Sequence, residues 1–316
     1  MFKKNGKGSI LLLATLLIMC VSALVIGCNA KPNDEKANNT EKITSNEGSV
    51  TNDWRKESYI NGILYQLSAE VKGLQYQAYK LARVQLDKRI AEREAGTYKK
   101  PIAIISDIDD TLASDCNYIA GIVMQDEKWD NGPWNGYYDS IASTSNVAIP
   151  GAVEFMNYAA DNGVETFYIT NREHDQLDLS VAQLQRLGFP NADKEHIQVC
   201  NESGSSDKTE RRENILKDYE VVMYLGDNIG DFTEDFSREL GTVKRTELAS
   251  DPKYKDLWGD KWIVLPNATY GNYVDAVWNN KKDLTEAEKV QAIKEILNNY
   301  SYTNTDKYEQ WYKLGN

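Results

Sequence analysis

The sequence predicts an α/β fold in which a parallel sheet is flanked by helices. Short apolar segments typical of buried strands occur at 102–106, 165–170, 197–200, 221–226 and 262–265. Helical patterns separate most of these segments and lie at 151–161, 175–187, 209–217 and 231–240. Strands that alternate with helices pair in parallel through crossover connections, and ligands bind beyond the carboxyl ends of such strands.

The amino terminus has the features of an export signal. Three lysines precede an apolar run at 10–26, and this run ends in the sequence Val-Ile-Gly-Cys at Cys28. That ending resembles a bacterial lipobox, which predicts a signal peptide at 1–27, a lipidated Cys28 and an extracytoplasmic protein anchored to the bacterial membrane. The alternative is an uncleaved membrane helix. The small residue before Cys28 favours the lipobox.

Composition then divides the remaining chain into a tether and one folded domain. Residues 28–53 are polar with almost no large apolar groups, which predicts a disordered tether. Residues 54–316 are enough to bury a full core. The net charge is −12 and no basic run with interleaved aromatics occurs, which argues against a nucleic-acid polymer as partner.

The folded domain is predicted to begin and end with helices. Apolar residues recur at three- and four-residue spacing over 54–94, which indicates one long or broken helix. Thr285 and Glu288 form a capping box that opens a final amphipathic helix. The domain holds only two cysteines, Cys116 and Cys200. An oxidising environment permits a bond between them, but two isolated cysteines form no disulfide framework, and unpaired thiols are favoured.

Asp107 and Asp109 come directly after the first strand, in the stretch IAIISDIDDTL. Side chains two positions apart share one face of a strand, so both carboxylates converge at its carboxyl end. Paired carboxylates beside an apolar strand are costly without a cation, which makes a divalent metal the expected occupant. The alternative is an acidic turn in which Thr111 caps a helix.

Polar side chains follow the other strands in a fixed order. Thr170 and Asn171 close the second strand, and Lys208 stands at the start of a helical pattern. Asp227 and Asp231 follow the strand at 221–226. Singly, each is explained by a strand end, a turn, a solvated charge or a helix amino terminus. Their common position at one edge of the sheet favours a catalytic site.

The segment 113–148 shows no clean helix or strand and is dense in aromatic and turn-forming residues. Loops of this length inside a compact domain are usually functional, so we expect a small aromatic-rich cap over the site.

This order of segments resembles the haloacid dehalogenase superfamily and, within it, the class C, or lipoprotein-type, bacterial acid phosphatases and 5′-nucleotidases. The resemblance rests on the lipobox, the cap and the motifs DIDDT, FYITNR, DKTERR, YLGDNIGDF and LPNATYG, and it covers nearly the whole mature domain. The chain departs from the family at Asp110, where a glutamate is usual, and at 113–116. These departures leave the nucleophile unaffected and put substrate preference in doubt.

The resemblance implies Mg²⁺-dependent hydrolysis of phosphate monoesters on a haloacid dehalogenase-like Rossmannoid sheet. Asp107 would be the nucleophile that forms an aspartyl-phosphate, and Asp109 the acid and base. Mg²⁺ would bind Asp107, the backbone carbonyl of Asp109, and Asp227, with support from Asp231. The phosphoryl oxygens would be bound by Thr170, Asn171 and Lys208.

Three aromatic residues match family positions that stack a nucleobase or nicotinamide ring: Tyr118, Trp134 and Tyr270. They imply a nucleoside monophosphate as the substrate, with packing of the cap as the alternative for each ring. Two other functions stay open. One is a phosphotransferase that uses the same intermediate, and the other is a non-catalytic surface binding lipoprotein.

Overall fold

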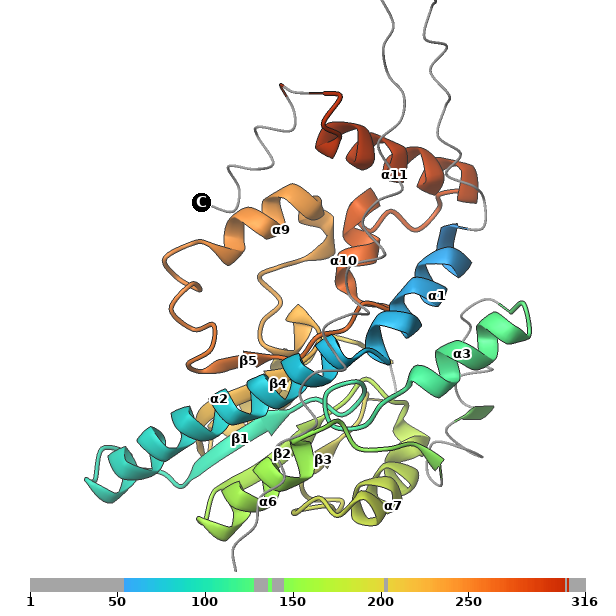
Figure 1. The fold of residues 1–316 in the computed structure, drawn as a ribbon. Coiled ribbons are helices and arrows are strands. Elements are labelled where there is room, and N and C mark those ends of the chain that lie inside the picture. The colour runs from blue at the N-terminus through green and yellow to red at the C-terminus, as the bar shows by residue number, and fades with distance from the viewer. Residues whose placement is uncertain (1–53, 128–135, 138–144, 202–203, 305, 307–316) are drawn as a thin grey trace, which may run out of the picture. The chain divides into compact units, whose positions relative to one another are not determined.

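Five parallel strands form the centre of the fold, in the order β3-β2-β1-β4-β5 (Figure 1). The computed structural model describes residues 54–127, 136–137, 145–201, 204–304 and 306, which belong to one unit that spans 49–316. The strands are β1 (Ile102–Ser106), β2 (Glu165–Ile169), β3 (Ile197–Gln198), β4 (Glu220–Gly226) and β5 (Trp262–Val264). The predicted α/β fold with a parallel sheet is confirmed.

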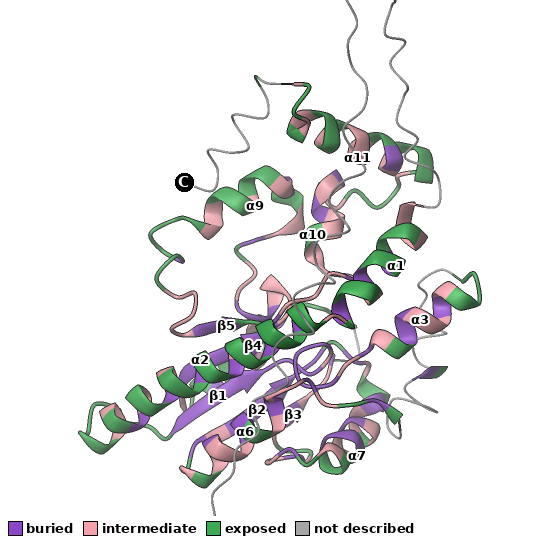
Figure 2. Cartoon of the chain, viewed as in Figure 1, coloured by how far each residue is buried: buried purple, intermediate pink, exposed green. Residues whose placement is uncertain are grey.

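Helices cover both faces of the sheet. One face packs against α2 (Ala69–Glu94), α6 (Ala152–Asp161) and α7 (Leu177–Leu187), and the other packs against α8 (Thr209–Leu216). Strand β1 supplies both cores because its side chains alternate: Ile104 faces the first, and Ile105 faces the second. Figure 2 shows the strands buried and the outer surfaces of the helices exposed. Burial of each such isoleucine stabilises the fold by about 1.5–3 kcal/mol.

The remaining helices lie around the sheet and the helices that cover it. They are α1 (Trp54–Gln66), α3 (Cys116–Met124), α9 (Gly241–Ala249), α10 (Asn272–Asp275), α11 (Glu286–Tyr300) and the 3₁₀ turns η2 (His174–Gln176), η3 (Ile229–Asp231), η4 (Arg238–Leu240) and η5 (Ala276–Trp278). The predicted capping box at the start of α11 is present. The Thr285 hydroxyl oxygen accepts a hydrogen bond from the backbone amide of Glu288, and the Glu288 carboxylate accepts one from the backbone amide of Thr285. The first predicted helix is broken after Gln66, and Ser68 caps the second part.

The helix expected at 231–240 is wrong. Only the short turns η3 and η4 form there, and α9 begins at Gly241. Packing outweighs helix periodicity in this segment, because Phe232 and Phe236 are both buried in an aromatic cluster with Tyr254 and Trp262.

Part of the segment 113–148 is helical, which the sequence did not predict. Helix α3 is apolar on nearly all sides, so it carries no one-sided hydrophobic pattern. It packs against α1 through a cluster that includes Tyr59, Ile119 and Ile122.

Cys116 and Cys200 are unpaired thiols. In the part of the chain that the structure describes, no helix is both long and apolar enough to span a bilayer.

Candidate active site

Strand β1 carries Asp107 to the carboxyl edge of the sheet. The Asp107 amide donates to the Leu225 carbonyl of β4 at 3.0 Å, so the residue is held as if the strand continued. The residue is buried, with only 7% of its surface exposed. The chain then turns at Asp110, whose φ of 54° is left-handed and whose amide donates to the Ala113 carbonyl at 2.7 Å. This turn leaves Asp109 beside Asp107.

Lys208 lies inside the site rather than in solvent. The residue is 2% exposed, and its ammonium group donates to Asp107 Oδ1 at 2.6 Å, Asp231 Oδ1 at 2.7 Å and the Ile169 carbonyl at 2.7 Å. These bonds use all three donors of the group. Burial alone would lower the pKa of Lys208, but the carboxylates of Asp107 and Asp231 outweigh it and raise the pKa above its ordinary value. A permanent positive charge therefore stands beside Asp107.

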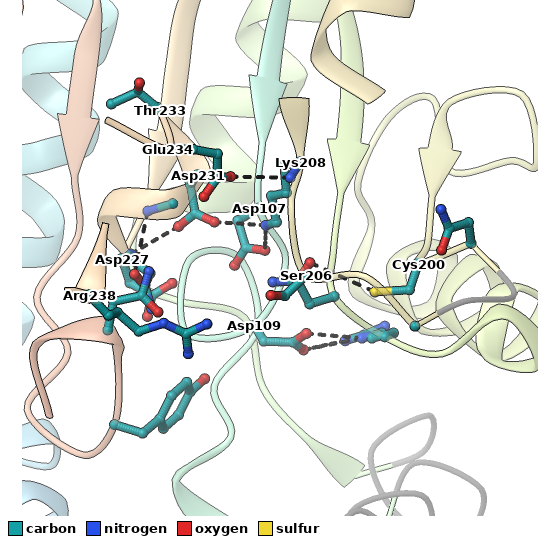
Figure 3. A pocket seen from close by; sticks show the side chains of 18 of the residues that line it. Asp107, Asp109, Cys200, Ser206, Lys208, Asp227, Asp231, Thr233, Glu234 and Arg238 are labelled. Atoms are coloured by element: carbon teal, nitrogen blue, oxygen red, sulfur yellow. Dashed lines mark hydrogen bonds and ion pairs between the residues drawn. The ribbon is translucent and has the colours of Figure 1, made fainter. Parts of the chain in front are cut away.

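Three carboxylates meet next to Lys208. Oxygen atoms of Asp107, Asp227 and Asp231 lie within 4.8 Å of one another (Figure 3). Burial raises the pKa of Asp107 to about 7, with Lys208 opposing and the nearby carboxylates adding to the rise. Burial and the charges of Asp231, Asp107 and Asp110 raise the pKa of Asp227 well above its ordinary range. A hard divalent cation would relieve this repulsion, so the donor set fits Mg²⁺.

Neighbouring side chains fix the orientation of Asp227. Asn267 donates to Asp227 Oδ2 at 2.8 Å, and the Thr111 hydroxyl donates to Asp227 Oδ1 at 3.1 Å. Thr111 therefore acts within the site, whereas the acidic-turn interpretation gave it a helix cap. Its hydroxyl is buried and links the segment after β1 to the segment after β4.

Gly226 is required for Asp231 to reach this group. A Cβ atom at position 226 would lie 2.4 Å from both Cβ and Oδ2 of Asp231. Asp231 Oδ2 also accepts the Asn228 amide at 2.9 Å, which holds the η3 turn against the end of β4. A side chain at Gly226 would push Asp231 away from Lys208.

Asp109 is held by Arg172 and Thr170. The Arg172 guanidinium is 1% exposed and donates to Asp109 Oδ1 at 2.7 Å through Nη2 and at 3.2 Å through Nε. Its other donors bond Ser180 at 2.9 Å and Gln183 at 2.5 Å. The Thr170 hydroxyl donates to Asp109 Oδ2 at 3.1 Å, and its predicted contact with a phosphoryl oxygen stays a prediction. Thr170 and Arg172 therefore orient the carboxylate.

Asn171 presents donors to the cavity. Arg211 donates to Asn171 Oδ1 at 3.0 Å, and its other nitrogen donates to the Thr170 carbonyl at 2.6 Å. Because a guanidinium only donates, the amide oxygen of Asn171 must face Arg211, and its NH₂ group is left to donate elsewhere. This arrangement suits a phosphoryl oxygen as the partner.

These residues line one cavity of about 900 Å³. Its wall includes Asp107, Asp109, Asn171, Lys208, Asp227, Asp231 and Tyr270. Figure 3 shows the side chains of Asp107, Asp227 and Asp231 close to one another, whereas the Asp109 carboxylate points away from them, along its bonds to Arg172. Thus one cavity brings together most of the residues that the sequence selected.

The aromatic residues are placed differently from one another. Tyr270 is part of the cavity wall, whereas the Tyr118 ring is buried in the cap and lies 5.1 Å from the Tyr137 ring. Trp134 lies outside the described residues. Ring stacking stays a prediction.

Comparison with known proteins decides the family. A model of the haloacid dehalogenase (HAD) superfamily, subfamily IIIB (acid phosphatase), matches residues 28–273, a range that contains every site residue named above. The chain belongs to this family of acid phosphatases. Two crystal structures of the class C acid phosphatase from Bacillus anthracis, one with tungstate bound, are 29% identical to it. The comparisons give TM-scores of 0.69 and 0.68, and each covers 76% of this chain and 96% of the solved chain.

The acid phosphatase site also contains buried residues that sequence reasoning did not select. Asp115 is fully buried at the start of α3, and its side chain hydrogen-bonds Asp109. Burial, together with the charges of Asp109 and Asp110, raises the pKa of Asp115 well above its ordinary range. Burial also raises the pKa of Asp110 to about 6. Asp110 belongs to the DIDDT motif itself, whereas only proximity to that motif signalled Asp115.

Proposed function

We propose that this protein hydrolyses phosphate monoesters with Mg²⁺ through an aspartyl-phosphate on Asp107. The observation that supports this best is the pairing of Asp107 and Asp109 in one cavity, with Lys208 bonded to the first and Arg172 to the second. A phosphate monoester needs a nucleophile, positive charge near the phosphoryl group and a proton for the leaving oxygen. Each has a matching side chain here.

In the first step, a carboxylate oxygen of Asp107 forms a bond to phosphorus while the bond from phosphorus to the leaving oxygen breaks. Asp109 gives its proton to that oxygen, and an alcohol departs. Lys208 and the Asn171 amide stabilise the charge that develops on the phosphoryl group. Asp109 must be protonated for this step, so Asp115 is placed to share its proton with Asp109.

In the second step, Asp109 acts as a base. A water oxygen attacks phosphorus, its proton passes to Asp109, and the bond between phosphorus and Asp107 breaks to release inorganic phosphate. Arg172 favours the charged form of Asp109 that this step requires. Bound at Asp107, Asp227 and Asp231, Mg²⁺ would supply charge neutralisation for the phosphoryl oxygens.

The test is phosphate release from a panel of nucleoside monophosphates and simple aryl phosphates, measured with and without EDTA. We expect release from several substrates, loss of activity after chelation, and recovery when Mg²⁺ is added back. Asp227→Asn should raise the Mg²⁺ concentration needed for half-maximal activity. Full activity after exhaustive chelation would remove the metal from this proposal, and no release from any substrate would favour a binding lipoprotein.

The proposed substrate class is nucleoside monophosphates, which makes the protein a 5′-nucleotidase. Tyr270 in the cavity wall supports this, because an aromatic face stacks any nucleobase. The tungstate bound to the Bacillus anthracis relative is a tetrahedral oxyanion like phosphate, which supports phosphate as the group bound. In the panel, nucleotides should exceed ring-free phosphate esters in kcat/KM, and equal values would reduce the proposal to a general phosphatase.

We further propose that the protein is lipidated at Cys28 and held outside the cytoplasm by this anchor. The support is the lipobox-like ending of the apolar run at 10–26. Cys28→Ser should move the protein from the membrane fraction to the soluble fraction, because the acyl chains have no other attachment. Retention in the membrane would point to an uncleaved helix.

A further inference from the structure

The cavity wall includes Arg238, a residue that the proposed mechanism does not use. Arg238 is the first residue of η4 and belongs to the same cavity wall as Asp107 and Asp109. Figure 3 shows its side chain reaching into the opening from the side of Asp227, toward Asp109. The leaving group of a substrate must extend past Asp109, since Asp109 gives it a proton.

The donors of Arg238 are less fully used than those of the other cations in the wall. All three Lys208 donors have partners, and Arg172 bonds Asp109, Ser180 and Gln183. Among the described residues, the hydrogen bond found for the Arg238 guanidinium is one from Nη1 to Asp275 Oδ2, at 3.2 Å. The side chains of this pair are 29% and 38% exposed. Such a partly exposed pair stabilises weakly, so an incoming anion can displace Asp275.

The position of Arg238 is fixed before any ligand binds. Ser237 caps η4 by accepting the Glu239 amide at 3.3 Å, and Arg245 donates to the Phe236 carbonyl at 2.9 Å. Phe236 itself is buried in the aromatic cluster under the site. On the other side, Asn279 donates to the Glu239 carbonyl at 3.1 Å, so the turn that carries the guanidinium is anchored before and after Arg238.

The cavity wall has more acidic than basic side chains, so a cation in it can serve to bind an anionic group. Eight carboxylates line the described part of the cavity, against the three permanent cations Arg172, Lys208 and Arg238. A leaving group with its own negative charge would be repelled there unless a cation met it. A guanidinium presents a planar fork of donors that matches a carboxylate or phosphate with two parallel hydrogen bonds. The polar side chains of Asn228, Ser237 and Asn272 lie in the same wall and suit a hydrophilic leaving group.

We propose that Arg238 binds a second anionic group, a carboxylate or phosphate, on the leaving alcohol of the substrate. This inference rests on the proposed phosphatase function and adds a preference to it: phosphate monoesters with an anionic leaving group are favoured over equivalent neutral ones. Before the substrate binds, Asp275 accepts a hydrogen bond from the Arg238 guanidinium. Arg238 is therefore a specificity-determining residue.

The experiment uses a series of ω-carboxyalkyl phosphates, each paired with the hydroxyalkyl phosphate of equal chain length. The measured quantity is the ratio of kcat/KM within each pair, which cancels general damage to the enzyme. For the wild type, the ratio should exceed one, pass through a maximum at the length that reaches Arg238, and fall as salt is added. Loss of a charge-assisted hydrogen-bonded pair predicts that Arg238→Gln lowers the maximal ratio by roughly 10-fold or more.

Two further variants sharpen the result. Asp275→Asn should raise the ratio, because it frees the guanidinium, and Lys244→Gln serves as a matched control that removes an exposed cation of α9 outside the cavity wall. A ratio that is the same in the wild type and Arg238→Gln at every length would overturn the inference, including the case in which both substrates lose activity equally. Failure of the phosphatase proposal looks different, since no phosphate would then be released from either series.

Discussion

Replacement of Asp107 by asparagine is expected to lower phosphate release by roughly 10⁴-fold or more, the scale at which loss of a catalytic nucleophile acts in other hydrolases. The amide has no carboxylate oxygen to attack phosphorus, but it has the same shape, and its oxygen can still accept from Lys208. The fold should therefore persist. Initial rates with an aryl phosphate and a nucleoside monophosphate provide the measurement.

The matched control is Asp218→Asn, an aspartate that is exposed in the turn after α8. It should keep wild-type rates, and both variants should melt within a few degrees of the wild type. Near wild-type turnover by Asp107→Asn would show that another group attacks phosphorus.

Replacement of Lys208 by methionine should affect both activity and stability. Removing one partner from a buried ion pair costs about 3–5 kcal/mol, because the remaining charge is left without compensation. Here two carboxylates, Asp107 and Asp231, would lose the same ammonium group. Loss of an electrostatic group that stabilises the transition state adds a decrease of about 10²–10³ in kcat.

The stability loss in Lys208→Met should depend on pH. Asp107 already has a raised pKa, of about 7, although Lys208 opposes the rise, so loss of Lys208 raises it further. An acid whose pKa is higher in the folded state destabilises the fold as pH rises above its unfolded value. The difference in Tm between variant and wild type should thus change little from pH 4 to pH 6 and grow as the pH rises above about 7, where Asp107 ionises in the wild type but stays protonated in the variant, with both measured without metal. A difference that does not grow above pH 7 would contradict this account, and Lys208→Arg, which keeps the charge, should lose less stability.

The sequence predicted the parts of the site that follow strands. Asp107, Thr170 and Asp227 are fixed by strand ends, and parallel strands bring their carboxyl ends to one edge, so local pattern and topology were enough. Lys208 was selected from its place in the order of segments, although its burial among three acceptors could not be derived from a helix start.

The parts that were missed depend on contacts between distant residues. Arg172 follows two selected residues, yet its role arises from Ser180 and Gln183 on the next helix, which enclose the guanidinium. The bond between Thr111 and Asp227 joins residues 116 positions apart. Helix α3 escaped prediction because nearly all its sides are apolar, and the helix expected at 231–240 failed because buried aromatic packing decided the local conformation.

The most direct test of the central claim is to trap the covalent intermediate. The enzyme would be mixed with a good aryl phosphate substrate, quenched with acid during turnover, and treated with borohydride, which reduces an aspartyl-phosphate to homoserine. Peptide mass spectrometry then locates the converted residue. We predict homoserine at position 107 alone, absent without substrate and absent in Asp107→Asn. Turnover with no converted residue, or with conversion at another carboxylate, would contradict the proposed mechanism.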